Sequence, residues 1–210
     1  VLMAATATVC VLPPAIAVGW LLARRQFAGK ALLETVVSLP LVLPPVASGL
    51  VLLWLFGRRS PVGQALDAVG IEVIFTWKAV VAAMMVISFP LVTRSVRAGI
   101  EQVDRRYEQI AATLGASPFR ILRTITLPLA SRGIAAGAVL GFSRSLGEFG
   151  ATIMVAGAIP GQTRTIAVGI YSLVETGRED AAWGLVAVAA LLAFGAIYVS
   201  NRLLDSGARS

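Results

Sequence analysis

The sequence predicts an all-α membrane protein, a polytopic bundle of about five transmembrane helices with one cytoplasmic helix-turn-helix. Of its 210 residues, 57% are hydrophobic and only 14% are charged. Its mean hydropathy of +0.83 is well above that expected for a soluble domain of this size. The apolar runs are continuous and do not alternate with period two, which favours helices over a transmembrane barrel.

Five apolar segments are long enough to cross a hydrocarbon core, which takes about 20 helical residues. They are residues 1–23, 36–56, 74–92, 133–158 and 181–204. Prolines interrupt the first three segments, and the second carries Pro40, Pro44 and Pro45. Each proline removes a backbone donor, so the carbonyl group that it frees needs a partner in a neighbouring helix or a water-filled cavity. Pro44 and Pro45 therefore either serve helix packing or line a pathway.

The charges of the loops predict the orientation. Twelve of the eighteen Lys and Arg residues lie on one side if residues 24–30, 94–132 and 202–210 all face the cytoplasm. The positive-inside rule then gives a multi-pass protein of the inner (plasma) membrane, with its N-terminus outside and its C-terminus in the cytoplasm.

Composition excludes several functions. Histidine is absent and the single cysteine, Cys10, lies in an apolar stretch, so no catalytic, cofactor-binding or metal-binding residues are expected. The net charge of +7 is spread over several loops without interleaved aromatic residues, which argues against a nucleic-acid partner. No internal repeat is visible, so residues 1–210 are interpreted as one domain.

Residues 99–131 predict a helix, a tight corner and a second helix. Asp104 can cap the first helix, and Gly115 suits the left-handed position that ends it. Ser117 and Pro118 are typical of the cap and first turn of the second helix. One face of the first helix carries four residues: Tyr107, Ile110, Ala111 and Leu114.

The corner is built from small residues, which allow another protein to approach the backbone closely. These are Ala111, Ala112, Gly115 and Ala116. The segment is therefore interpreted as a docking knob. The alternative is an amphipathic hairpin that lies on the membrane with its arginines on lipid phosphates.

Arg144 and Glu148 are placed about half of the way through the fourth apolar segment. An unpaired charge at that depth costs about 2.5–3.5 kcal/mol. On one helix, the spacing of four residues lets the two side chains neutralise each other. The pair either locks the helix to its neighbours or, together with Ser145, Gly147 and Gly150, borders a conduction route as a gate. A fixed anion site at Arg144 is disfavoured because a transporter must release its substrate.

The hairpin resembles the coupling loop of permease subunits of bacterial ABC importers. Gly115, nine intervening residues and then Ile125-x-Leu127-Pro128 match the tail of that motif. Its usual Glu-Ala-Ala head is imperfect here, with Gln109 at the Glu position and Glu108 one step early. The resemblance implies ATPase coupling through Glu108, Gln109, Ala111, Ala112, Gly115, Ala116 and Pro118.

Three longer stretches resemble the molybdate permeases of the sulfate/molybdate/tungstate importer group. They are LPLVLPPVASGLVLLWLFGRRSPVG, SRSLGEFGATIMVAG and IPGQTRTIAVGIYSLVE. The resemblance implies a homodimer in membrane lipid, two cytoplasmic ABC ATPase subunits, and a periplasmic or lipid-anchored molybdate-binding protein. ATP and magnesium would bind the ATPase, because the only Gly-Lys pair, Gly29-Lys30, lacks the rest of a phosphate-binding loop.

Two kinds of alternative remain at this point. Within the same importer group, the substrate could be sulfate or tungstate. From another class, the chain could be a passive anion channel or a membrane-embedded enzyme. A channel would have no need of the corner motif, and an enzyme would need a nucleophile and a base that this chain does not offer.

Overall fold

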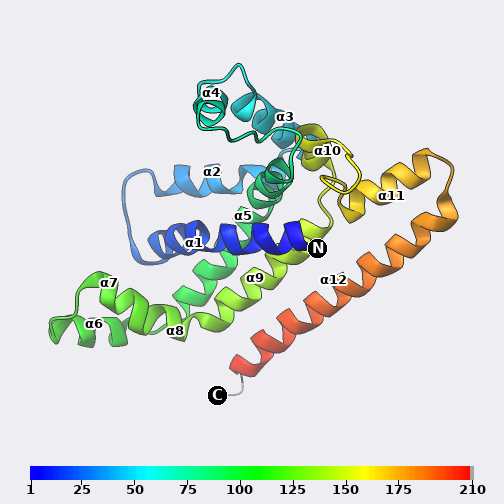
Figure 1. Ribbon diagram of the computed structural model, residues 1–210. Coiled ribbons are helices and arrows are strands. Elements are labelled where there is room, and N and C mark those ends of the chain that lie inside the picture. The colour runs from blue at the N-terminus through cyan, green and yellow to red at the C-terminus, as the bar shows by residue number, and fades with distance from the viewer. Residues whose placement is uncertain (209–210) are drawn as a thin grey trace.

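The computed structural model describes the backbone of residues 1–208 and the side chains of residues 1–202. Over these residues the chain is helical and has no strand, as predicted (Figure 1). The helices are α1 (Leu2–Arg24), α2 (Lys30–Val42), α3 (Pro45–Phe56), α4 (Pro61–Ala68), α5 (Trp77–Glu101), α6 (Arg105–Thr113), α7 (Pro118–Ile121), the π-helical turn η1 (Leu122–Thr126), α8 (Leu127–Leu129), α9 (Ser131–Leu146), α10 (Gly150–Ala156), α11 (Ile166–Glu175) and α12 (Glu179–Ala208).

Three helices within the described part of the chain are long and apolar enough to cross a membrane unaided. They are α1, α5 and α12. Two bent pairs raise the number to five if each pair makes one crossing: α2 with α3, and residues 118–129 with α9. The upper number equals the five crossings predicted. The second bent pair, however, joins residues 118–129, which were predicted to lie in the cytoplasmic loop, to α9, and so it does not correspond to the predicted span 133–158.

The predicted second and fourth spans are not continuous helices. Residues 36–56 break between α2 and α3 with a bend of 112°. Leu43 and Pro44 are extended there because Pro44 and Pro45 cannot donate the backbone hydrogen bonds that would continue α2. Residues 133–158 break after Leu146, and α10 begins only at Gly150. The interruption of the second segment at Pro44 and Pro45 was predicted, whereas the break after Leu146 in the fourth segment was not.

The core is formed by α1, α5 and α9, which pack through small residues. A Cβ atom on Gly133 of α9 would lie 2.6 Å from the Cα atom of Gly99 on α5. A Cβ atom on Gly137 of α9 would lie 2.8 Å from the Cβ atom of Ser95 on α5. On the other side of α5, a Cβ atom on Gly19 of α1 would lie 2.9 Å from a Val96 methyl group. Close backbone approach of this kind is the usual way in which membrane helices associate.

A second layer consists of the two helices that follow the breaks, α3 and α10. A Cβ atom on Gly49 of α3 would lie 2.9 Å from the Cα atom of Ala151 on α10. One on Gly150 would lie 2.9 Å from Pro45 Cβ. The two breaks therefore face each other across a tight contact.

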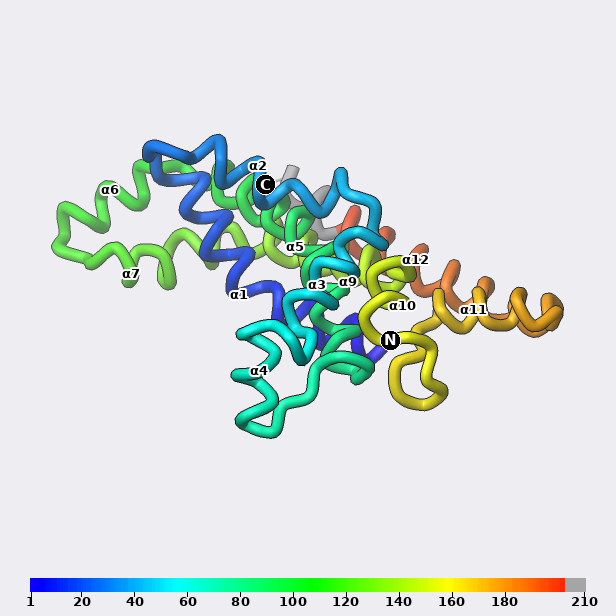
Figure 2. Tube along the Cα trace, turned by 90° about the horizontal axis from the view of Figure 1, so that it is seen from above, coloured from blue at the N-terminus to red at the C-terminus, as the bar shows by residue number. Residues whose placement is uncertain are grey.

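The remaining elements lie at the periphery. The short helices α6 and α7 project at one end of the molecule, and α11 lies at the opposite end (Figure 2). Helix α12 packs on α9 and α11 but leaves most of its apolar surface exposed, including Trp183, Leu191 and Phe194. Such a surface requires lipid or another protein against it.

Candidate functional site

The projecting hairpin has the local structure that the sequence predicts. The Asp104 carboxylate accepts a hydrogen bond from the Arg106 N–H at 2.9 Å and caps α6. Gly115 has a φ of +83°, the left-handed conformation that ends the helix. The Ser117 hydroxyl accepts from the Arg120 N–H at 3.4 Å, and Pro118 occupies the first turn of α7. The predicted helix, corner and helix are confirmed.

Helix α6 has two faces of different character. Tyr107, Ile110 and Leu114 form an exposed apolar face, with relative exposures of 57%, 58% and 82%. Phe119 on α7 is exposed to a similar degree. We call these four residues the apolar face. The opposite side of α6 lines a pocket against the end of α1 through Arg105, Glu108, Gln109 and Ala112.

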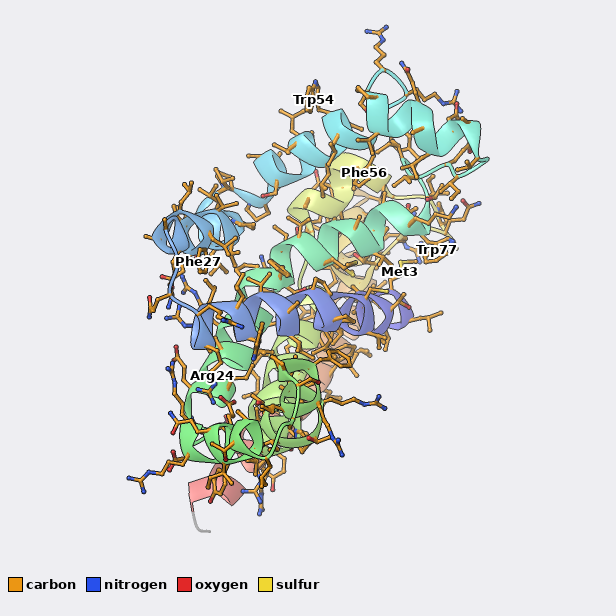
Figure 3. The ribbon with its side chains drawn as sticks, turned by 90° about the vertical axis from the view of Figure 1, so that its left-hand side faces the viewer. Met3, Arg24, Phe27, Trp54, Phe56 and Trp77 are labelled. Carbon is orange, nitrogen blue, oxygen red and sulfur yellow. The ribbon has the colours of Figure 1, made fainter. Side chains whose placement is uncertain are left out.

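An inward network ties the hairpin to α1. The Arg24 guanidinium, in the last turn of α1, lies 3.0 Å from the Glu108 carboxylate and donates to the Val103 carbonyl at 2.9 Å. The Thr126 hydroxyl donates to the same carboxylate at 2.7 Å. We call Arg24, Val103, Glu108 and Thr126 the Arg24 node. Figure 3 labels Arg24 at the end of α1. Arg105 adds a bond to the carbonyl of Ala23 at 3.2 Å.

The predicted coupling residues differ in how exposed they are and in whether they are already bonded within the chain. The Glu108 side chain is only 18% exposed and is already bonded to Arg24 and Thr126. Ala111 and Ala116 are half-buried, whereas Gln109, Ala112, Gly115 and Pro118 are exposed. Sequence reasoning missed Arg24 and Thr126. No local signal could have found their contacts, because 84 residues separate Arg24 from Glu108.

The charged pair lies at the break between α9 and α10. Arg144 is in the last turn of α9, Glu148 lies in the break, and Nη1 and Oε2 are 3.2 Å apart. The predicted pairing is confirmed, but the two residues do not share one continuous helix. Glu148 also accepts a hydrogen bond from the Ala151 N–H at 2.8 Å. Its carboxylate therefore stabilises the start of α10 as well as Arg144.

The other predicted pathway residues gather near the same break only in part. Pro45 contacts Gly150, which confirms Gly150 as a position of close helix approach. Gly147 has no such role within the described structure, since a Cβ atom there would meet only the Arg144 carbonyl, at 3.9 Å. Pro44 forms the exposed first break.

Three buried hydroxyl groups near the breaks lack a hydrogen-bond partner among the described residues. They belong to Ser48 on α3, Ser145 on α9 and Thr152 on α10. Unsatisfied buried hydroxyl groups are costly in a rigid apolar core. Thr93 on α5 is a fourth such group, so unpaired hydroxyl groups occur in the α1–α5–α9 core as well as near the breaks.

The fold and the hairpin identify the class of protein. A profile of the binding-protein-dependent transport system inner membrane component family matches residues 15–209, so the chain belongs to this family. The inward-facing MetNI methionine ABC transporter has a similar fold, with a TM-score of 0.64 at 18% identity over 96% of this chain and 91% of that one.

Within the family, the chain is similar to named permeases. It is 49% identical to the molybdenum transport system permease protein ModB of Escherichia coli K12, over 91% of this chain and 85% of that protein. It is 37% identical to the sulfate transport system permease protein CysT of Salmonella typhimurium, over 80% of this chain and 61% of that protein.

Proposed function

We propose that this chain is the membrane-spanning subunit of an ATP-driven importer of molybdate. The observation that carries the substrate is its 49% identity to a molybdenum permease over nine tenths of the chain. The similarity to a sulfate permease is lower and covers less of both chains, so sulfate is the second candidate and tungstate the third.

The apolar face supports a cytoplasmic ATPase as the partner of the hairpin. Tyr107, Ile110, Leu114 and Phe119 expose apolar surface at a projecting tip, where water contact is unfavourable. The complex would contain a second copy of this chain, two ATPase subunits that bind ATP and magnesium, and a molybdate-binding protein on the outer side. The N-terminus would lie outside and the C-terminus in the cytoplasm, as the loop charges predict.

The hairpin is connected so that its movement reaches three helices. It lies between the end of α5 at Glu101 and the start of α9 at Ser131, and these two helices are in close contact at Gly99 and Gly133. The Arg24 node adds α1. ATPase closure would thus move α1, α5 and α9 together as one body.

The α3–α10 layer supports a gate next to this body. Glu148 and Arg144 fix the break before α10, and Gly150 fits α10 against Pro45. In this proposal, these residues together with Pro44, Ser145 and Gly147 would border a passage that small shifts of the short helices open or close. High-affinity anion binding there is not proposed, since a substrate must also leave.

The test is reconstitution of the chain with its binding protein and ATPase in proteoliposomes. We expect uptake of radiolabelled molybdate that requires ATP. The uptake should be lost when the ATPase is replaced by a variant that cannot hydrolyse ATP. Unlabelled tungstate and sulfate measure the substrate preference by competition. Uptake by this chain alone, unchanged when the ATPase is omitted, would indicate a passive channel and contradict the proposal.

A further inference from the structure

We infer that the pocket between the end of α1 and the hairpin binds the phosphate group of an anionic lipid. The pocket has a volume of about 310 Å³, roughly ten times the volume that one water molecule occupies in the liquid. It is lined by Trp20, Arg24, Arg25, Arg105, Glu108, Gln109, Ala112, Pro118, Ile121, Leu122 and Thr126.

The charges of the lining favour an anion. Three arginines and one glutamate give a net charge of 3 − 1 = +2. Glu108 is already neutralised by Arg24 at 3.0 Å, so Arg25 and Arg105 carry the excess. Arg105 uses one nitrogen on the Ala23 carbonyl and retains further N–H donors. Guanidinium groups match phosphate oxygens better than any other side chain.

The position of the pocket favours a lipid over a free ion. Helix α1 is apolar enough to span a membrane and ends at Arg24, so its last turn would lie at the surface of a membrane that α1 crosses. Trp20 is one turn earlier, at the depth where tryptophan is enriched in membrane proteins. The Arg25 guanidinium lies over the Trp20 ring, 5.8 Å from its centre. Trp20, Ile121 and Leu122 offer apolar surface beside the arginines, which suits the glycerol and upper chains of a lipid.

The pocket and the apolar face lie on opposite sides of α6. The pocket side carries Arg105, Glu108 and Gln109, and the apolar face carries Tyr107 and Ile110. An ATPase bound to the apolar face would therefore leave the pocket open to the membrane. A lipid held there would contact both α1 and the hairpin, the two elements that the Arg24 node joins.

This inference rests on the proposed orientation, but its test needs neither transport nor the ATPase. The purified full chain is titrated with phosphatidylglycerol, and bound lipid is counted by native mass spectrometry. Arg25→Gln and Arg105→Gln are each expected to weaken binding about fivefold. Arg25→Gln is the safer variant because Arg25 is exposed and its cap bond to the Leu21 carbonyl is made by the backbone N–H, which glutamine keeps. The matched control removes two charges outside the pocket, Arg106→Gln with Arg123→Gln, and should leave binding unchanged.

Two further measurements distinguish a lipid phosphate from a free oxyanion as the ligand of the pocket. Phosphatidylcholine, which has no net charge, should bind much more weakly than phosphatidylglycerol at the same concentration. Inorganic phosphate and molybdate should not displace the lipid at millimolar concentration. Equal binding by the pocket variants and the control variant would overturn the inference, as would displacement by either free anion.

Discussion

Two ion pairs in the described part of the chain, Arg24–Glu108 and Arg144–Glu148, differ in what they connect. Arg24 and Glu108 come from elements 84 residues apart, and both side chains are largely buried, at 8% and 18% exposure. Arg144 and Glu148 are four residues apart at a helix break, where the arginine is 34% exposed and the glutamate 1%. The first pair joins separate parts of the molecule. The second pair fixes the shape of one bend. The buried Glu148 needs Arg144 as its counter-charge, whereas the more exposed Arg144 can also be solvated by water.

The largest effect is expected at the second pair. Arg144→Ala leaves the Glu148 carboxylate buried without a counter-charge, which costs about 3–5 kcal/mol in the free energy of unfolding. Adding Glu148→Gln should recover part of this loss, because a neutral amide can still accept from the Ala151 N–H. Unfolding of the detergent-solubilised protein, followed by tryptophan fluorescence, compares the variants. A double variant no more stable than Arg144→Ala would show that the buried charge is not the cause.

The first pair should affect coupling more than stability. Arg24→Ala removes the bonds to Glu108 and Val103, which should lower the free energy of unfolding by about 2 kcal/mol. We expect ATP hydrolysis to continue while molybdate uptake per ATP falls about tenfold or more, since α1 no longer follows the hairpin. The control is Arg58→Ala, which breaks the exposed pair with Glu72 and should change neither quantity. A parallel fall in ATP hydrolysis and uptake would assign Arg24 to ATPase binding instead.

The corner can be tested separately from the tie to α1. Gly115→Val places a β-branched residue at a φ of +83°, which costs about 1–2 kcal/mol. Nothing described lies within 4 Å of the new Cβ position, so the backbone alone is strained. Gly115→Asn is the control, because asparagine tolerates the left-handed conformation. We expect lower uptake per ATP for the valine variant, and equal uptake by both variants would contradict a role for the corner geometry.

The smallest effect is expected at Thr126. Thr126→Val keeps the shape of this buried side chain but removes its 2.7 Å hydrogen bond to Glu108. The loss should lower the free energy of unfolding by about 1 kcal/mol. Thr126→Ser retains the hydroxyl group and serves as the control. Thermal unfolding of both variants gives the difference. Because Thr126→Ser also loses a buried methyl group, the deciding comparison is with the unsubstituted chain. If the valine variant is as stable as that chain, the node consists of Arg24, Glu108 and Val103 alone.

Local chemistry explains what the sequence predicted well. Asp104, Gly115, Ser117 and Pro118 each act on their own neighbours along the chain, so their caps and corner could be predicted without a tertiary structure. The spacing of Arg144 and Glu148 revealed their pairing for the same reason. The Arg24 node depends on α1 and the hairpin meeting in space, which no local pattern encodes.

Other features were visible in part. Pro44 and Pro45 indicated an interruption, but the 112° bend depends on how α3 packs against α10. The glycines at 133, 137 and 141 recur every four residues, a recognised pattern for close helix packing, so the contact of α9 with α5 has a signal in the sequence. Helix α11, of ten residues, was missed because it is too short to count as a membrane span.

The most direct measurement is co-purification of the ATPase with variants of the apolar face. Ile110→Ser with Leu114→Ser removes exposed apolar surface from α6 without touching the Arg24 node. The control is Val69→Ser with Ile71→Ser, two exposed apolar residues outside the hairpin. The account predicts that the ATPase is lost from the first variant and retained by the second. Full retention of the ATPase by the α6 variant would contradict the claim that this hairpin is the coupling element.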